Sequence, residues 1–112
     1  MTDLAALTRA YIAAFDARDP SRIAPLLADG FALEDPVVKR VEGRDAALKA
    51  MADIFASCQA LSFSARNIFV DGDTTLIEFD LRLDQTHLKG VDVIQWRGNQ
   101  MAELRAYLDI PK

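Results

Sequence analysis

Four segments in the second half of the chain decide its fold: LSFSARNIFV (residues 61–70), TTLIEFDLRL (74–83), LKGVDVIQW (88–96) and MAELRAYLDI (101–110). Within them apolar and polar side chains alternate, as in Ile77-Glu78-Phe79-Asp80. Side chains two residues apart in a strand point to the same face of a sheet, so this period predicts strands with one apolar face. Short turn sequences such as Asp71-Gly72-Asp73 separate the segments and predict antiparallel pairing.

The first part of the chain has helical periodicity instead. Apolar side chains recur at three- and four-residue spacing over residues 4–15, behind a capping Thr2 or Asp3. The pair Asp19-Pro20 ends this helix, because the residue before a proline is disfavoured in a helix. Proline suits the first turn of a new helix, so we expect a short second helix over about residues 20–28.

A third helix is expected over residues 44–58, and a connecting region lies before it. In that region residues 31–35 are predicted to form a short strand that Pro36 stops, and residues 37–43 a loop or a short hairpin. This order predicts an α+β fold, in which three N-terminal helices pack on one side of a curved antiparallel sheet. We expect the sheet and helices to form a cone whose open end is a small-molecule pocket.

Length and composition predict a single domain spanning residues 1–112. Apolar residues make up 51% of the chain, which is enough to fill one core. The formal net charge of −4 argues against binding to nucleic acid or to an anionic membrane surface, because both need clustered Lys and Arg. The single cysteine, Cys58, cannot form an intrachain disulfide, and no signal peptide or membrane span is visible, so we expect a cytoplasmic protein.

Three polar residues stand out because their surroundings are apolar. Tyr11 lies on the apolar stripe of the first helix, Asp35 lies directly before Pro36, and Asp92 lies within the apolar segment 91–96. A carboxyl group on the inner face of a sheet is costly unless it is paired, hydrogen-bonded or neutral, and sites of proton transfer hold carboxyl groups in such positions. The sequence therefore offers one candidate base, Asp35, and two candidate hydrogen-bond donors, Tyr11 and a neutral Asp92.

Each of these residues has an alternative structural role. Asp35 would cap the turn that follows it, as Asp often does. Asp92 would bond to a backbone amide, to Arg66 or to Arg97. Tyr11 would be a core aromatic whose hydroxyl reaches the rim of the core.

No metal or cofactor site is predicted. His87 is the only histidine and is expected to be exposed, and one histidine makes a poor metal site. Cys58 is expected to pack against its neighbours and not to act as a nucleophile. The five glycines are scattered at turns and form no phosphate-binding loop.

Four segments carry a resemblance to a known family: residues 11–19 (YIAAFDARD), 26–36 (LLADGFALEDP), 43–47 (GRDAA) and 91–98 (VDVIQWRG). The chain resembles the nuclear transport factor 2-like superfamily, in particular its branch of ketosteroid isomerases and SnoaL-like polyketide cyclases. The resemblance covers about residues 7–108. It implies the cone-shaped (cystatin-like) fold of that superfamily and a homodimer formed through the outer face of the sheet.

The resemblance also implies roles for individual residues. Ketosteroid isomerases use a tyrosine on the first helix, a base aspartate in a Glu-Asp-Pro context and an oxyanion-hole aspartate in a late strand. These correspond to Tyr11, to Asp35 within Glu34-Asp35-Pro36, and to Asp92. The expected enzyme is an isomerase without a cofactor, which moves a proton alpha to a carbonyl of a hydrophobic small molecule.

The candidate pocket lining combines apolar residues from the predicted helices and strands: Leu26, Met51, Phe55, Ile77, Phe79, Ile94, Trp96 and Leu104. Other functions share the same fold. A SnoaL-like polyketide cyclase or a hydrolase would keep the acid–base aspartate and change the substrate. A module that only binds small molecules or mediates oligomerisation would need no catalytic base.

Overall fold

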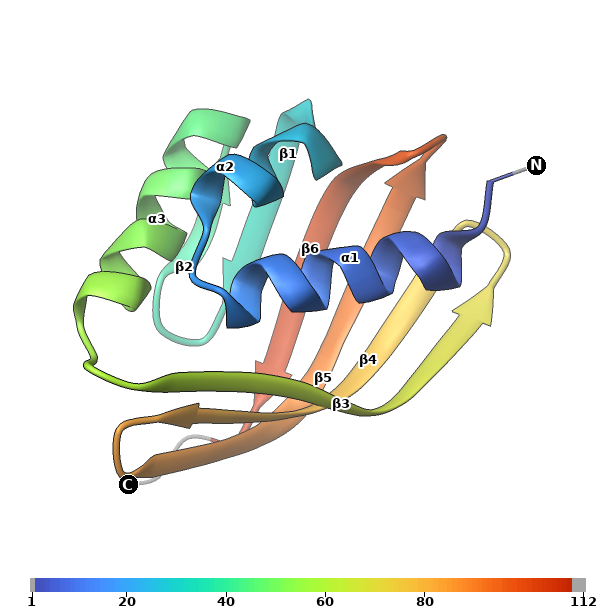
Figure 1. Cartoon of the computed structure of the whole chain (residues 1–112). Coiled ribbons are helices and arrows are strands. Elements are labelled where there is room, and N and C mark those ends of the chain that lie inside the picture. Colours follow the sequence, from blue (N-terminus) through green and yellow to red (C-terminus); the bar gives the residue numbers. More distant parts are fainter. Residues whose placement is uncertain (1, 110–112) are drawn as a thin grey trace.

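The computed structural model describes residues 2–109 of the chain, and it confirms the α+β class. Six strands form one curved sheet in the order β2-β1-β6-β5-β4-β3 (Figure 1). Their bounds are β1 Leu27–Asp35, β2 Lys39–Glu42, β3 Leu61–Asp71, β4 Thr74–Leu83, β5 Thr86–Arg97 and β6 Gln100–Leu108.

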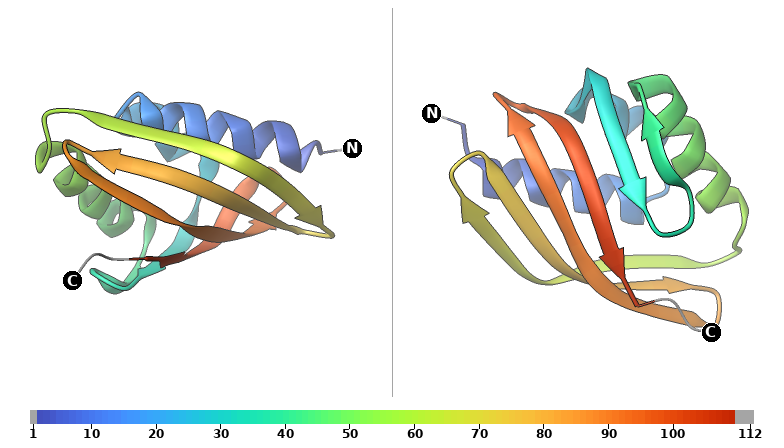
Figure 2. Two further views of the ribbon diagram at one scale, coloured as in Figure 1. Left: turned by 90° about the horizontal axis from the view of Figure 1, so that it is seen from below. Right: turned by 180° about the vertical axis from the view of Figure 1, so that it is seen from behind.

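The helices cover one face of this sheet and leave the other face bare of any described element (Figure 2). Their bounds are α1 Leu4–Asp16, α2 Pro20–Ile23, the 3₁₀ helix η1 Ala24–Leu26, and α3 Arg44–Ala56. Helix α1 begins as predicted, since the Asp3 carboxylate accepts the N–H of Ala6 at 3.0 Å. None of the helices within residues 2–109 is both long and apolar enough to cross a membrane.

The four alternating segments form the antiparallel run β3-β4-β5-β6, as predicted. Strand β4 has the predicted bounds, and the register pairs Ile77 with Asp92 on the neighbouring strand. The last strand ends at Leu108, and Ile110, which the prediction included, lies outside the described residues. Local alternation was therefore sufficient to locate this half of the sheet.

The sheet as a whole is mixed, and the prediction that it is antiparallel throughout was wrong. Strand β1 pairs in parallel with β6, with Leu33 opposite Leu104. Short turns fix the relative direction of consecutive strands only. Strands β1 and β6 are far apart in sequence, so no turn between them indicates their direction.

The boundaries between the first helices and β1 also differ from the prediction. Helix α2 ends at Ile23, and the strand begins at Leu27 and not at Phe31. Pro25 has no N–H with which to continue α2. The strand starts early because Leu27 and Phe31 are both fully buried on the sheet.

The region over residues 37–43 is a hairpin, and this decides between the two predicted alternatives. Strand β2 pairs antiparallel with β1, and the register sets Asp35 opposite Lys39 at the end of the hairpin. The third helix ends at Ala56, slightly before the predicted Cys58. The hairpin holds the turn after Asp35 beside the helices, where it reaches the cavity described next.

Candidate functional site

A cavity of about 270 Å³ lies between the helices and the inner face of the sheet. Its wall comes from α1, α3 and the residue after it, the strands β1 and β3 to β6, and the turn between β1 and β2. The wall residues are Tyr11, Phe15, Leu33, Asp35, Val37, Val38, Met51, Ile54, Ser57, Phe63, Phe79, Leu81, Leu83, Leu88, Asp92, Leu104, Ala106 and Leu108. The structure therefore brings Tyr11, Asp35 and Asp92 to the same cavity. Among the described wall residues there is no Lys, Arg or His, so no positive charge faces these three groups.

Two anchors on helix α1 hold Tyr11 in place. One turn before it, Thr8 is fully buried, and its Oγ1 lies 2.7 Å from the carbonyl oxygen of Leu4 and 2.9 Å from Oγ1 of Thr75 on β4. After it, the Asp16 carboxylate accepts the backbone N–H of Phe63 on β3 at 2.8 Å. These contacts tie the helix to β4 and to the edge of the sheet.

The first anchor is part of a chain of hydrogen bonds. The indole N–H of Trp96 donates to Oγ1 of Thr75 at 2.9 Å. Each hydroxyl has one proton, so all four groups are satisfied when Thr75 donates to Thr8 and Thr8 donates to the Leu4 carbonyl. Buried polar groups that are fully bonded in this way fix one arrangement of the elements that carry them.

The Tyr11 side chain itself is 3% exposed and borders the cavity. Burial, and then the negative charge of Asp92, raise the pKa of Tyr11 well above its usual range. The phenol therefore keeps its proton throughout the neutral and moderately basic range. It can act as a hydrogen-bond donor to a group inside the cavity.

Asp92 faces the interior because alternate residues of β5, such as Leu88 and Ile94, share the inner face of the sheet. It is 5% exposed. Gly90, next on the same face, permits the close approach of β6, since a Cβ there would collide with the backbone of Tyr107. Asp92 therefore lies next to this close approach of the two strands, on the face that borders the cavity.

The Asp92 carboxyl has no protein partner among the described residues. Every fully buried side-chain polar atom there has a hydrogen-bond partner. The Asp92 oxygens have no such partner, so they are not fully buried and must be accessible from the cavity. The alternative pairing with Arg66 does not occur, because that guanidinium lies 4.0 Å from Asp80. Arg97 is exposed, beyond the buried Trp96.

Burial, and then the negative charge of Asp35, raise the pKa of Asp92 to about 8. The carboxyl group is therefore mostly protonated at neutral pH. A protonated carboxyl has one O–H to donate, so Asp92 is a second donor beside Tyr11. The negative charge of Asp35 acts on Asp92 across the cavity that both residues border.

Asp35 lies at the end of β1 and is partly exposed at the cavity. Its Oδ1 accepts the backbone N–H groups of Val37 and Val38, each at 2.7 Å. The turn-capping role suggested from the sequence is thus real, and it does not remove the residue from the cavity. Both bonds use Oδ1, and no donor among the described residues reaches Oδ2, which can accept a proton.

The predicted lining is only partly at the cavity. Met51, Phe79 and Leu104 border it. Of the other five predicted residues, four lie in the solid core: Phe55, Ile77, Ile94 and Trp96. The fifth, Leu26, is partly buried and packs against that core.

The reasons for these differences are specific. Ile94 and Trp96 share the inner face with Asp92 but lie further along β5, where the Thr75 contact closes the packing. The ring of Phe55 packs against Phe15, with 4.9 Å between ring centroids. Phe15 in turn is one of the wall residues that the prediction missed.

Most of the missed wall residues follow the period that located the strands. Leu81 and Leu83 continue the inward series of Ile77 and Phe79 on β4. Ala106 and Leu108 continue that of Leu104 on β6. The alternation identifies the inner face, whereas the packing of the helices decides which part of that face is hollow.

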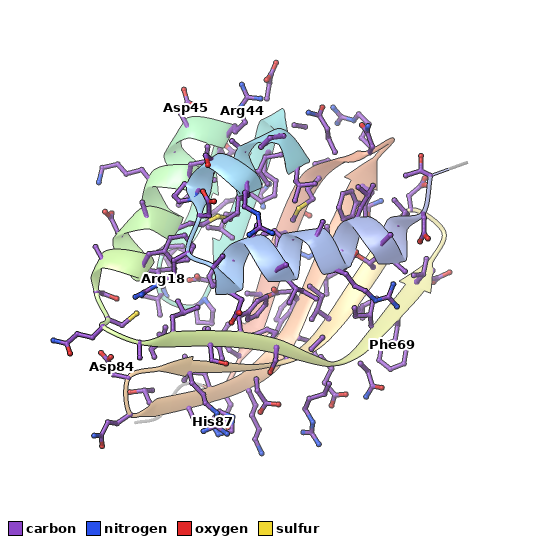
Figure 3. All side chains as sticks on the ribbon, in the orientation of Figure 1. Arg18, Arg44, Asp45, Phe69, Asp84 and His87 are labelled. Atoms are coloured by element: carbon purple, nitrogen blue, oxygen red, sulfur yellow. The ribbon has the colours of Figure 1, made fainter. Side chains whose placement is uncertain are left out.

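The remaining reactive side chains lie away from the cavity wall. His87 lies on β5, on the outer face of the sheet (Figure 3). Its Nε2 is 2.7 Å from Oδ1 of Asp80, an interaction that lowers the pKa of Asp80. Cys58 lies in the connection from α3 to β3, where Arg18 donates to its carbonyl oxygen at 3.3 Å. Asp84 accepts two backbone N–H groups of the same connection. Within residues 2–109 no group of three His, Cys, Asp or Glu residues is arranged to hold a metal ion.

The model of the SnoaL-like domain family matches residues 8–104. The chain belongs to the SnoaL-like family. The matched range contains Tyr11, Asp35 and Asp92, and all of strands β1 and β5, which carry the two aspartates. A comparison with curated proteins finds no match.

Solved structures agree with this assignment of the SnoaL-like chain. A nuclear transport factor 2-like protein of unknown function from Cytophaga hutchinsonii has a TM-score of 0.85 at 14% identity, with 97% of this chain and 92% of that chain covered. A candidate ketosteroid isomerase from Kribbella flavida has a TM-score of 0.83 at 20% identity, covering 96% and 78%. A candidate SnoaL-like polyketide cyclase from Jannaschia sp. CCS1 has a TM-score of 0.84 at 16% identity, covering 94% and 84%. At these identities the likeness shows a shared fold. The family match over residues 8–104 confirms the predicted superfamily.

Proposed function

We propose that the protein is a cofactor-independent isomerase that transfers a proton alpha to a carbonyl of a hydrophobic small molecule. The observation that carries this proposal is the convergence of Tyr11, Asp35 and Asp92 on one apolar cavity, with two of them protonated at neutral pH. Membership of the SnoaL-like family is consistent with isomerase or cyclase chemistry. The role of each residue follows from its chemical state.

Asp35 is the base in this proposal. Its Oδ2 takes a proton from the carbon next to the substrate carbonyl, and the electrons of the broken C–H bond form an enolate. Asp35 then returns the proton to a different carbon of the same molecule, so that no oxidant or reductant is needed. The two backbone N–H bonds to Oδ1 orient the carboxylate for this transfer.

Tyr11 and Asp92 stabilise the enolate. Negative charge develops on the carbonyl oxygen during proton removal, and both groups donate hydrogen bonds to it. Donors that are already oriented in an apolar cavity lose little energy to reorganisation and act more strongly than they would in water. This is the arrangement that the resemblance to ketosteroid isomerases implies.

The test is hydrogen exchange of a small ketone. Loss of the alpha-proton signals of 2-tetralone in deuterated water, followed by NMR, reports proton removal directly. The wild-type protein should accelerate the exchange, and Asp35→Asn should reduce the acceleration by about 10²- to 10⁴-fold. The amide oxygen can still accept the two turn N–H groups, so the variant should keep its fold.

Asp29→Asn is the matched control, because Asp29 is an aspartate at the surface that pairs with Arg44 outside the cavity. It should exchange 2-tetralone at the wild-type rate. Wild-type exchange in Asp35→Asn would contradict the role of the base. In that case the protein would be a binding module with the same cavity.

The proposed partner of the chain is a second copy. By register, Phe69 on β3 (Figure 3) and Tyr107 on β6 belong to the bare outer face, and both are 56% exposed. Exposed aromatic side chains are enriched in interfaces. Sedimentation should show a dimer that Phe69→Lys weakens by at least about tenfold, whereas Val37→Lys at the exposed hairpin should not. A wild-type monomer at micromolar concentration would contradict this proposal.

A further inference from the structure

The volume of the cavity limits what it can hold. A cavity of about 150 Å³ in a protein core accommodates benzene, which has six carbon atoms. By proportion, about 270 Å³ corresponds to about eleven non-hydrogen atoms. Two fused six-membered rings with one oxygen substituent have this size, whereas pockets for drug-sized ligands begin at about 300 Å³.

The aromatic side of the cavity wall is tightly packed and resists expansion. Phe63 packs against Phe15 with 4.9 Å between ring centroids and against Phe79 with 5.2 Å. On the side of α3 the wall is formed by Met51, which is 1% exposed, and by the partly buried Ile54. Side chains that already pack against one another cannot move apart to admit a larger ligand without strain.

The charge of the wall limits the ligand as well. Two carboxyl groups, Asp35 and Asp92, border the cavity, and the described wall has no cationic side chain. A charged group is costly to bury without a partner of opposite sign. An anionic group beyond the reach of Tyr11 and Asp92, such as the carboxylate of a keto acid, would therefore find no compensation. A single oxygen, neutral in a ketone or charged in an enolate or phenolate, can meet these two donors.

We infer that the substrate is a neutral ketone of one or two rings, with about eleven non-hydrogen atoms inside the cavity, and not a four-ring molecule enclosed along its length. The placement of the ketone oxygen rests on the proposed function. The size limit rests on the wall alone. Met51 is a specificity-determining residue in this inference, because it is the one fully buried α3 side chain among the described wall residues.

The test compares two-ring and three-ring compounds as hydrocarbons and as alcohols: naphthalene, phenanthrene, 2-naphthol and 9-phenanthrol. Titrations followed by the fluorescence of the rings give their affinities for the wild-type protein. Each three-ring compound should bind at least about tenfold more weakly than its two-ring counterpart, because it overfills the cavity. If the third ring instead strengthened binding by about 100-fold, as four more buried carbons would, the size limit would be overturned.

Two methionine variants sharpen the test. Met51→Ala enlarges the cavity and should raise the affinity for phenanthrene by at least about tenfold. Met101→Ala is the control, because Met101 is equally buried but does not border the cavity, and it should leave the ratio of the two hydrocarbons unchanged. Equal changes in both variants would contradict the role of Met51. If Met51→Ala does not fold, Met51→Val should move the ratio in the same direction by a smaller amount.

The hydrocarbons separate this inference from the proposed function. They have no oxygen, so their size preference does not depend on Tyr11 or Asp92. A preference for naphthalene with no gain from the hydroxyl group of 2-naphthol would support the size limit and contradict the donor role. A gain from the hydroxyl group together with tighter binding of three rings would contradict the size limit and support the donors.

Discussion

Helix α1 covers two regions of the sheet that differ in whether their buried polar groups have hydrogen-bond partners in the protein. Around Thr8, the hydroxyl groups and the Trp96 indole form a closed chain of hydrogen bonds in a solid core. Around Tyr11, one turn further along, the phenol and the Asp92 carboxyl face a cavity without protein partners. The same helix and the same strands build both regions, so the difference lies in the side chains.

This difference separates stability from function. A polar group that is buried and fully bonded contributes modestly to folding, whereas one that lacks a partner costs free energy. The region around Thr8 therefore stabilises the position of the helix. The region around Tyr11 and Asp92 keeps unused hydrogen-bonding capacity, which a ligand with an oxygen acceptor can satisfy.

The largest expected effect concerns Asp92 and pH. The pKa of its carboxyl is about 8 in the folded protein and near 3.8 when it is exposed to water. Between these values the folded state binds a proton that the unfolded state has released, so the free energy of unfolding falls as pH rises. The loss is up to about 1.4 kcal/mol per pH unit, and up to about 6 kcal/mol across the window.

Asp92→Asn should remove this dependence, because an amide does not titrate. Urea unfolding of both proteins at pH 5, 7 and 9 would measure it. The difference in unfolding free energy, variant minus wild type, should grow more positive from pH 5 to pH 8 and stay constant above pH 8. If the unfolding free energies of the two proteins instead changed in parallel with pH, Asp92 would not be protonated in the folded state.

A smaller effect is expected in the bonded region. Thr75→Val keeps the shape of the side chain and removes the hydroxyl that accepts the Trp96 N–H. The indole N–H is then buried without a partner, which should lower the free energy of unfolding by about 2 kcal/mol. Thr74→Val is the matched control, since its hydroxyl bonds to Gln95 at the surface, and it should change stability by less than about 0.5 kcal/mol. Equal effects of the two variants would contradict the importance of the chain of hydrogen bonds.

The sequence was sufficient to predict what depends on local alternation. The period of two located β4 to the residue and placed Asp92 on the inner face of β5. The parallel pairing of β1 with β6 was not predictable in this way, because it joins strands that no short turn connects.

The extent of the cavity could not be predicted from the sequence either. Ile94 has the same orientation as Asp92 on the same strand, yet it is fully buried in the solid core while Asp92 borders the cavity. What separates them is how closely α1 packs on each part of the sheet. That closeness depends on contacts such as that between Thr8 and Thr75, which join residues far apart in the chain.

The smallest effect on stability, and the sharpest contrast with Thr75→Val, is expected for Tyr11→Phe. The Tyr11 hydroxyl has no hydrogen bond to lose, so the free energy of unfolding should change by less than about 0.5 kcal/mol. The effect should appear in ligand binding instead. The affinity for 4-nitrophenolate, measured from the change in its absorbance, should fall by at least about tenfold, since a hydrogen bond to a charged group is lost. Tyr107→Phe, at the exposed tyrosine, should alter neither quantity. If Tyr11→Phe lost stability and kept its affinity for the phenolate, the hydroxyl would serve the fold, and the contrast between the two regions of the helix would disappear.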